Sequence, residues 1–377
     1  MGYPAAMTPI WIRYAEQFPV TKHLLYLNHA AVAPLAKPAA EAMARLAEEA
    51  CQWGAYHYSE WLAAYEGLRR AAARLIGSGP EEIAIVKNTS EGIATVANGL
   101  DWRPGDVAVV FREEFPANYF PWVRLERRGV RLRWLSIYDP LEAIDEACRG
   151  ARLLAASHVN YLSGYRIDLE AFGEICRRRG CLFFVDAIQG LGAFPIHVAR
   201  AGIDALAADG HKWLLGPEGC GILYVRREIL EQIEPVEFGW TNVAGYADYA
   251  SRDMTLRADA GRYECGTLNT IGCFGLRAAI EFLLEVSIDA IAAAVAALAG
   301  RLREGAREKG YEVLGPADEA ARSGIVSIRK PGFDSRAVVH SLRERGIIAS
   351  PRQGWIRLSP HFYIAPEAIE ATLEALP

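Results

Sequence analysis

The chain has 377 residues, of which 51% are hydrophobic and 23% charged, and its formal net charge is −5. This composition is typical of a folded globular protein and excludes a disordered chain. The basic residues form no long run, which argues against nucleic acid or an anionic membrane as the main partner. No segment reaches the roughly 18 apolar residues that a membrane helix needs. Because Met1 to Pro9 lacks the pattern of a secretory signal, we expect a cytoplasmic location.

Length and cysteine content limit the domain number and the redox chemistry. At about 100 to 200 residues each, two domains are expected. The seven cysteines contain no Cys-x-x-Cys pair, and their number is odd. We therefore expect reduced, mostly buried thiols and no metal site.

The first predicted helix precedes a large predicted sheet. Trp61 to Ile76 predicts a helix whose buried face carries Leu62, Tyr65, Leu68, Ala72 and Leu75. From Glu82 to about Val225, short β-rich runs then alternate with helical stretches, which predicts a mostly parallel sheet between helices, an α/β fold. The seven predicted strands are Ile83 to Val86, Val107 to Phe111, Val130 to Leu135, Leu153 to Ser157, Leu182 to Asp186, Ala205 to Ala208 and Gly221 to Val225.

Beyond about Leu256 the pattern changes to long helices and short strands, which predicts a smaller α+β domain. The predicted domains are an N-terminal segment over 1–25, a large cofactor-binding domain over 26–256 and a small C-terminal domain over 257–377. The helices expected in the last domain are Cys273 to Glu285, Ile288 to Lys309 and Pro366 to Leu376, and its strands lie around Ile325 to Ile328, Ile347 to Ala349 and Ile356 to Leu358. A cleft between two domains is a common place for a ligand site.

Two charged side chains at the ends of predicted strands point to a cofactor. Asp186 ends one run, and Lys212 follows another, within Gly210-His211-Lys212-Trp213. If these strands are parallel neighbours, the amine and the carboxylate meet at the carboxyl edge of the sheet, where open α/β sheets bind ligands. The pair suits pyridoxal 5′-phosphate, because a lysine holds its aldehyde as a Schiff base and an aspartate keeps its pyridine nitrogen protonated.

Each of these two residues also has an ordinary explanation. Lys212 alone could be a solvated loop residue, and Asp186 alone could cap a helix. The chain has only six lysines against thirty-five arginines, so a lysine is an infrequent choice for surface charge here. This bias favours a specific use of Lys212.

A polar segment between a predicted strand and a predicted helix indicates a place for a phosphate group. Asn88-Thr89-Ser90-Glu91-Gly92 brings hydroxyls and free backbone N–H groups to a helix N-terminus. The alternative is a plain capping box, with Asn88 as the cap and Glu91 three residues later. Both can hold together, because a cap leaves other amides free.

Four more side chains are candidates for the same site. Phe115 follows a strand and could lie flat on a heterocycle. Gln189 could donate to a ring oxygen, and His211 could donate to a phosphate or carry a proton. Arg357 could clamp a substrate carboxylate. A core phenylalanine, a solvated histidine and a surface arginine are the alternatives.

The order of these motifs resembles the class V aminotransferases. This pyridoxal phosphate family includes cysteine desulfurases, kynureninases, isopenicillin N epimerase and serine-glyoxylate aminotransferases. The resemblance extends from about Tyr26 to the C-terminus. The motifs that carry it are Asn88-Thr89-Ser90-Glu91-Gly92, Glu114-Phe115-Pro116, Ser157-His158-Val159, Val185-Asp186-Ala187-Ile188-Gln189-Gly190, Gly210-His211-Lys212-Trp213, Gly266-Thr267 and Arg357-Leu358-Ser359.

The resemblance implies a fold-type I enzyme with a defined set of cofactor contacts. Lys212 would form the Schiff base, Asp186 would be the pyridinium partner and Gln189 would donate to the ring hydroxyl. The phosphate would be held by Thr89, Ser90 and His211, and Phe115 would stack on the ring.

The resemblance also implies contacts to a second subunit and to the substrate. In the family, Gly266-Thr267 reaches the phosphate of the neighbouring subunit, which implies a homodimer with shared sites. Arg357 would bind the α-carboxylate of an amino acid, and Asn28 and His57 lie in segments that often line the substrate pocket.

Two departures from the family pattern affect the expected reaction. Cysteine desulfurases need a nucleophilic cysteine on a loop before the carboxylate-binding arginine, but no cysteine follows Cys273. This absence disfavours persulfide-forming desulfuration. Asp209 stands where many relatives have serine or threonine, and its charge would repel a phosphate unless it is turned away or paired.

We therefore expect a pyridoxal phosphate enzyme that acts on an amino acid, with transamination as the first choice and epimerisation or β-elimination as alternatives. An NAD-dependent dehydrogenase would need Gly-x-Gly-x-x-Gly after the first strand, where the chain reads Lys87-Asn88-Thr89-Ser90. A non-catalytic binding protein would not need Asp186 and Lys212 together.

Overall fold

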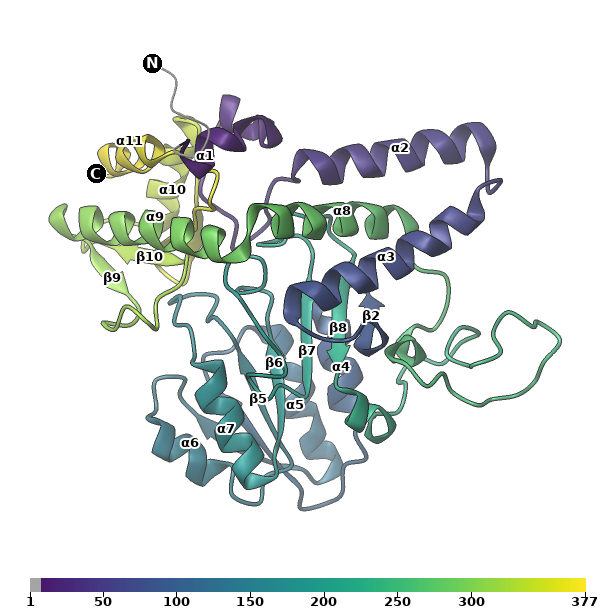
Figure 1. Ribbon diagram of the computed structural model, residues 1–377. Helices are drawn as coiled ribbons and strands as arrows, with labels where there is room; N and C mark the ends of the chain where they lie inside the picture. The colour runs from purple at the N-terminus through teal and green to yellow at the C-terminus, as the bar shows by residue number, and fades with distance from the viewer. Residues whose placement is uncertain (1–7) are drawn as a thin grey trace.

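The computed structural model describes residues 8–377 (Figure 1). Residues 1–7, at the start of the N-terminal segment predicted over 1–25, lie outside the described part. Among residues 8–377 no single helix is long and apolar enough to span a membrane, and only the pair Thr270–Val286 and Ile288–Glu308, bent by 82°, passes that test jointly. The cytoplasmic location and the domain boundaries stay predictions.

A seven-stranded sheet forms the centre of the larger part of the molecule. Its order is β2-β8-β7-β6-β5-β3-β4, and β8 runs antiparallel to both of its neighbours while the others run parallel. This confirms the predicted α/β fold and its mostly parallel sheet. The strands are β2 (Ile83–Val86), β3 (Val107–Phe111), β4 (Arg131–Leu135), β5 (Leu153–Ser157), β6 (Leu182–Asp186), β7 (Ala205–Asp209) and β8 (Gly221–Val225).

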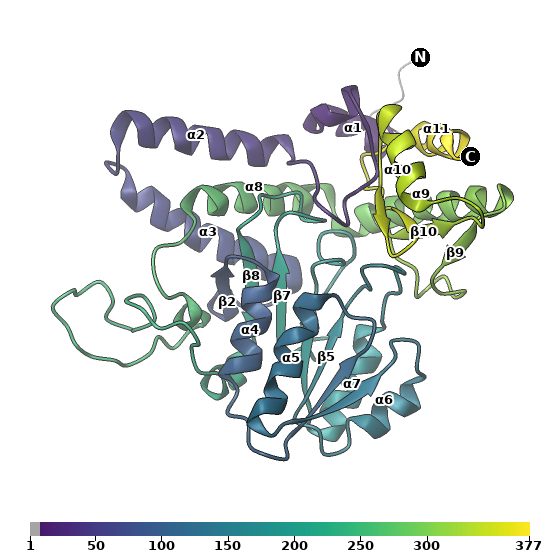
Figure 2. The same ribbon diagram turned by 180° about the vertical axis from the view of Figure 1, so that it is seen from behind.

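Helices cover both faces of this sheet, because alternate strand residues point to opposite sides. Ile83, Ile85 and Val109 belong to one buried cluster, and Ala84 and Val110 belong to the other. Figure 2 shows α4 and α5 in front of the sheet and α7 behind it. The helices of this part are α2 (Lys37–Trp53), α3 (Tyr58–Ile76), α4 (Thr89–Gly99), α5 (Phe120–Arg124), α6 (Leu141–Ala147), α7 (Leu169–Arg179) and α8 (Thr270–Val286).

Two details of the helices differ from the sequence-based expectation. Helix α2 was not predicted, and together with α3 it forms a hairpin that packs against α8 (Figure 1). Leu62, predicted to be buried, is 44% exposed, whereas Tyr65 and Leu68 are buried as expected. Leu62 lies near the start of α3, close to the α2–α3 turn, whereas the buried residues of this helix begin at Ala64.

A smaller sheet with order β12-β13-β10-β9 forms the centre of the second part, and all its pairs are antiparallel. A short parallel pair, β1 (Leu25–Tyr26) with β11 (Ile347–Ile348), joins the N-terminal segment to this part. The remaining elements are α1 (Ile10–Arg13), α9 (Ile288–Glu308), β9 (Glu312–Leu314), β10 (Val326–Arg329), α10 (Ser335–Glu344), β12 (Ser350–Arg352), β13 (Trp355–Leu358) and α11 (Pro366–Ala375).

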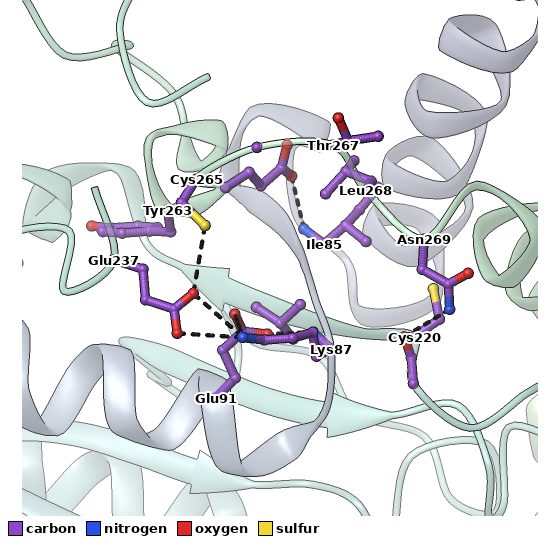
Figure 3. Close-up of a pocket in the computed structure, with 14 residues that line it drawn as sticks. Ile85, Lys87, Glu91, Cys220, Glu237, Tyr263, Cys265, Thr267, Leu268 and Asn269 are labelled. Carbon is purple, nitrogen blue, oxygen red and sulfur yellow. Dashed lines mark hydrogen bonds and ion pairs between the residues drawn. The ribbon is translucent and has the colours of Figure 1, made fainter. Parts of the chain in front are cut away.

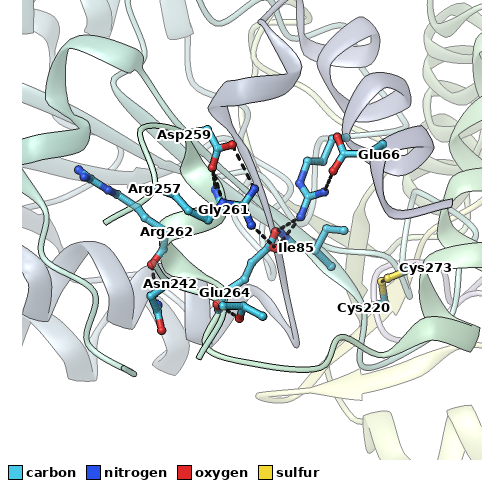
Figure 4. Close-up of polar contacts among 12 residues, drawn as sticks. Glu66, Ile85, Cys220, Asn242, Arg257, Asp259, Gly261, Arg262, Glu264 and Cys273 are labelled. Atoms are coloured by element: carbon cyan, nitrogen blue, oxygen red, sulfur yellow. Dashed lines mark hydrogen bonds and ion pairs between the residues drawn. The ribbon is translucent and has the colours of Figure 1, made fainter. Parts of the chain in front are cut away.

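A buried ion pair joins the segment after the long loop 234–259 to the sheet (Figure 4). Glu264 accepts hydrogen bonds from Arg69 of α3 at 2.7 Å and from the backbone N–H of Ile85 in β2 at 2.8 Å. Burial raises the pKa of Glu264, and the Arg69 charge opposes that rise. Removing either partner would leave a buried charge unpaired, so the pair fixes where residues 264–268 leave the body of the molecule.

Candidate active site

A pocket of about 290 Å³ opens at the carboxyl edge of the large sheet, between the two parts of the molecule. Strand β6 ends at Asp186, its neighbour β7 ends at Asp209, and the register pairs Asp186 with Ala207. Lys212 follows β7 by three residues, so both charged groups reach the same edge. The sequence-predicted site residues that line this pocket are Thr89, Ser90, Phe115, Asp186, Gln189, His211, Lys212 and Arg357.

Burial shifts the pKa values of Lys212 and Asp186, the two central groups of the pocket, in opposite directions. It lowers the pKa of Lys212 to about 8, although the charge of Asp186 opposes the change. Burial likewise raises the pKa of Asp186 to about 6, against the effects of the Ile188 N–H and of Lys212. Near neutral pH a useful fraction of the lysine is therefore an uncharged nucleophile beside a carboxylate.

The N-terminus of α4 forms the polar end of the pocket. The cap predicted at Asn88 is present, because its Oδ1 accepts from the N–H of Glu91 at 3.0 Å. The N–H groups of Thr89 and Ser90 lie in the first turn, where no carbonyl of the helix can accept them. A phosphate group placed there would meet free donors and the positive end of the helix dipole.

Asp209 is paired within the protein. Its Oδ2 lies 3.0 Å from His211 Nδ1, and its Oδ1 accepts from the N–H of Gly210 at 2.7 Å. Its own N–H donates to Thr89 Oγ1 at 3.0 Å. The Asp209 carboxylate thus lies beside Gly210 and the Nδ1 atom of His211, and Nε2 is the ring nitrogen of His211 left to meet an anion.

Aromatic and amide groups close the sides of the pocket. Phe115 is 46% exposed, and its ring centre lies 5.8 Å from Lys212 Nζ. Tyr161 packs edge-on against Phe115. Gln189 donates to the Ala30 carbonyl at 2.9 Å and accepts from Trp213 Nε1 at 3.0 Å, which leaves one amide hydrogen for a ligand.

Arg357 is a buried cation with unused donors. Its Nη1 donates to the Tyr161 carbonyl at 2.7 Å, whereas its Nε and Nη2 have no partner among the described residues. The residue is 2% exposed and lines the pocket. Unpaired buried donors are costly, so these two groups are suited to a carboxylate brought by a ligand.

Four predicted site residues do not line this pocket. Asn28 forms a parallel bridge with Ser359, and its buried Oδ1 has no hydrogen-bond partner among residues 8–377. His57 lies at the turn between α2 and α3, half-exposed, with Nδ1 3.1 Å from Glu49 Oε1.

Gly266 and Thr267, the other two, line a separate pocket beside β2 (Figure 3). There the side chains of Lys87 and Cys265 both contact Glu237, at 3.3 Å and 3.5 Å. In this chain alone, the Gly266-Thr267 segment therefore does not meet the phosphate end of its own pocket. The contact predicted between this segment and a neighbouring subunit stays a prediction.

Arg352 and Tyr161 line the pocket without having been predicted. The sequence signal for Arg352 was the dipeptide Gln353-Gly354, whose positive φ angles of 49° and 83° form the two-residue turn of the β12–β13 hairpin. Recognising that hairpin would have placed Arg352 beside Arg357. Tyr161 had no comparable signal.

The residues present fit pyridoxal 5′-phosphate. The pocket offers an amine that can be neutral, a buried carboxylate with one oxygen that accepts no hydrogen bond from the described residues, a helix N-terminus and an aromatic ring above the amine. Arg357 supplies unpartnered donors for the carboxylate of an amino acid.

Comparison with known proteins gives consistent matches along nearly the whole chain. The model of the aminotransferase class-V family matches residues 25–354. A probable cysteine desulfurase of Pyrococcus abyssi is 30% identical over 96% of this chain and 95% of that protein. An uncharacterized aminotransferase of Bacillus subtilis is 30% identical over 97% and 96%. The apo structure of a cysteine desulfurase from Thermococcus onnurineus has a TM-score of 0.89 and 27% identity, and 96% of each chain is covered.

These matches correct the predicted reaction. The sequence favoured an aminotransferase, with an epimerase or β-lyase as the alternative, and disfavoured persulfide-forming desulfuration; that prediction is wrong, since most of the similar proteins are named cysteine desulfurases. The prediction relied on the missing cysteine after Cys273. The absence of a cysteine from this loop does not decide whether the enzyme cleaves the carbon–sulfur bond of its substrate.

Proposed function

Because this chain belongs to the aminotransferase class-V family and is a pyridoxal 5′-phosphate enzyme acting on an amino acid, we propose that it is a cysteine desulfurase. It transfers the sulfur of L-cysteine to a thiol and releases L-alanine. The observation that carries the proposal is the match with probable cysteine desulfurases along nearly the full length of the chain. The pocket that holds Lys212, Asp186 and Arg357 together supports it.

The side chains of the pocket have different roles in the reaction. When bound, the cofactor supplies an electron sink for the electron pair released at the substrate. Lys212 Nζ anchors the cofactor between reactions, removes the proton from the substrate Cα and returns a proton to Cα after the sulfur has left. Asp186 keeps the proton on the ring nitrogen, and Arg357 orients the substrate through Nε and Nη2.

Sulfur transfer then balances without an added oxidant. An acceptor thiolate attacks the cysteine sulfur, a sulfur–sulfur bond forms, and the Cβ–S bond breaks with its electron pair going to Cβ. Cβ takes up a proton. The sum is L-cysteine plus RSH giving L-alanine plus RSSH.

The acceptor thiol comes from outside this pocket, since none of the residues that line it is a cysteine. Among the seven cysteines, all of them in the described part of the chain, only Cys51 and Cys265 are not buried. Burial and the nearby Glu237 carboxylate raise the pKa of Cys265, which makes it a weak nucleophile near neutral pH.

We also propose that two copies of the chain share their sites. Large apolar side chains are exposed on the loop 234–259 and on the α2–α3 turn, and such patches mark interaction surfaces. A pocket between α3 and this loop includes Gly266 and Thr267. The exposed side chains are Trp53, Tyr56, Phe238, Trp240, Tyr249 and Met254.

The proposal is tested by incubating the cofactor-loaded enzyme with L-cysteine and a thiol and measuring L-alanine and persulfide. Equal amounts of the two products are expected. Lys212→Ala should form neither, and the Cys51→Ser/Cys265→Ser double variant should keep its activity with an added thiol. Pyruvate and ammonia as the only products, or no reaction of cysteine with any thiol, would refute a desulfurase.

A further inference from the structure

A second arginine faces the pocket beside the one that suits a substrate carboxylate. In the β12–β13 hairpin, Ser350 pairs with Arg357 and Arg352 pairs with Trp355. Residues two apart on a strand lie on the same face of the sheet, and so do directly paired residues. Arg352 and Arg357 are therefore diagonal neighbours on one face, and both line the pocket.

Arg352 has no acidic partner within residues 8–377. Its one hydrogen bond is a 3.4 Å contact from Nη1 to the carbonyl of the adjacent Pro351, and it takes part in no ion pair. Its side chain is exposed at the mouth of the pocket, while Arg357 lies deeper. The guanidinium is thus free to meet a ligand.

The charge of Arg352 acts on its neighbours. Burial, and next the charge of Arg352, lower the pKa of Arg357 to about 9. Arg352 also contributes to the lowered pKa of Lys212, after burial and Arg357. Two neighbouring arginines without an acid between them repel each other, and anions bound at both would remove that repulsion.

The expected anions leave Arg352 without a partner. The cofactor phosphate would be held at the N-terminus of α4 and by His211, and the α-carboxylate of cysteine would be held by the unpartnered donors of Arg357. The reaction needs one more molecule, the acceptor thiol, because no cysteine lines the pocket. That molecule must enter past the mouth where Arg352 stands.

We propose that Arg352 forms a second anion subsite, which binds the carboxylate of the thiol that accepts the sulfur. The acceptor is then a small thiol that carries a carboxylate. This inference rests on the proposed desulfurase function. It assigns the two arginines of the hairpin to different molecules: Arg357 to the cysteine that is cleaved, and Arg352 to the thiol that attacks it.

The test compares two acceptors that differ only in charge. Cofactor-loaded enzyme is given a fixed, low concentration of L-cysteine with either 3-mercaptopropionate or its neutral amide, 3-mercaptopropionamide, and the initial rate of alanine formation with cysteine alone is subtracted, because cysteine is itself a thiol with a carboxylate. We expect kcat/KM for the acid to exceed that for the amide by about tenfold, as for loss of one charge-assisted hydrogen-bonded contact. In Arg352→Gln this ratio should fall to about 1, mainly through a higher KM for the acid.

Two further variants separate binding from general damage. Arg352→Lys should keep part of the preference for the acid, since it retains the charge without the bidentate geometry. Arg336→Gln, which removes an exposed arginine of α10, should keep all of it.

Equal use of the two acceptors by the unmodified enzyme, or an unchanged ratio in Arg352→Gln, would overturn the subsite while leaving the desulfurase proposal intact. Absence of alanine with every thiol would instead refute the desulfurase itself.

Discussion

Lys212 is the residue whose chemistry depends most on its surroundings. An exposed lysine with its ordinary pKa is almost wholly charged near pH 7, whereas a pKa of about 8 leaves about one molecule in ten neutral. Only the neutral amine attacks an aldehyde. Burial therefore gives Lys212 the neutral fraction that the proposed attachment of the cofactor requires.

This pKa predicts the pH dependence of cofactor capture. Because burial lowers the pKa of Lys212 to about 8, the neutral fraction grows as the pH rises, is one half near that pKa and is nearly complete about one pH unit above it. Mixing cofactor-free enzyme with pyridoxal 5′-phosphate should give a visible band at a rate that is half-maximal near the pKa of Lys212 and levels off about one pH unit above it. A rate that keeps rising to pH 10 would mean that Lys212 titrates like a solvated lysine.

Individual site residues were predictable where a short motif carries the chemistry. Asp186 ends a predicted strand, Lys212 and the Asn88 cap lie a few residues after others, and parallel strands bring their carboxyl ends to one edge. Arg352 was missed because its place beside Arg357 depends on the hairpin register. The pairing of Asp209 with His211 was equally hidden, since side-chain rotation decides it.

Helix α4 positions the phosphate end of the site by close packing on the sheet. A Cβ added at Gly92 would lie 2.7 Å from the Cβ of Ala207 in β7, which is too close for two carbon atoms. Only glycine lets the helix approach β7 this closely. The position of the free N–H groups of Thr89 and Ser90 depends on that approach.

Gly92→Ala should therefore destabilise the protein by about 1 to 3 kcal/mol, as overpacking does, and weaken cofactor binding. Gly300→Ala in α9 is the matched control, because nothing lies within 4 Å of the added Cβ. That change should stabilise the protein by up to about 1 kcal/mol. Urea unfolding of both variants measures the difference, and equal effects would show that α4 is not held by this contact.

Elements were predictable where hydrophobic periodicity was strong, as in the seven strands of the large sheet. The antiparallel direction of β8 could not be read from its sequence, because a buried strand has the same pattern in either direction. Helix α2 was missed because its buried residues are mostly alanines, which give little contrast.

Two features belong to the scale of the whole molecule. The N-terminal segment pairs with the C-terminal part, and one loop exposes an unusual surface. Strand β1 pairs with β11, so the N-terminal segment contributes to the C-terminal part (Figure 1). The loop 234–259 extends away from the body in both views and carries exposed aromatic side chains (Figures 1 and 2). Exposed large apolar side chains that gather on one loop mark an interaction surface.

We propose that a second copy of the chain packs on this loop. Light scattering tests whether the protein is a dimer. The expected mass is twice 41.4 kDa. Replacing Trp240 and Tyr249, which are 46% and 79% exposed, by arginine should shift the protein towards monomer and loosen the cofactor. If the double variant stays dimeric, another surface forms the dimer.

The central claim is that the side chains of Asp186 and Lys212 hold one pyridoxal 5′-phosphate between them. Borohydride treatment of the cofactor-loaded enzyme, followed by digestion and mass spectrometry, tests it most directly, because reduction fixes the cofactor to the lysine that holds it. The phosphopyridoxyl group is expected on Lys212 and on none of the other five of the six lysines. A label on another lysine, or no label on a protein that retains the cofactor, would contradict the claim.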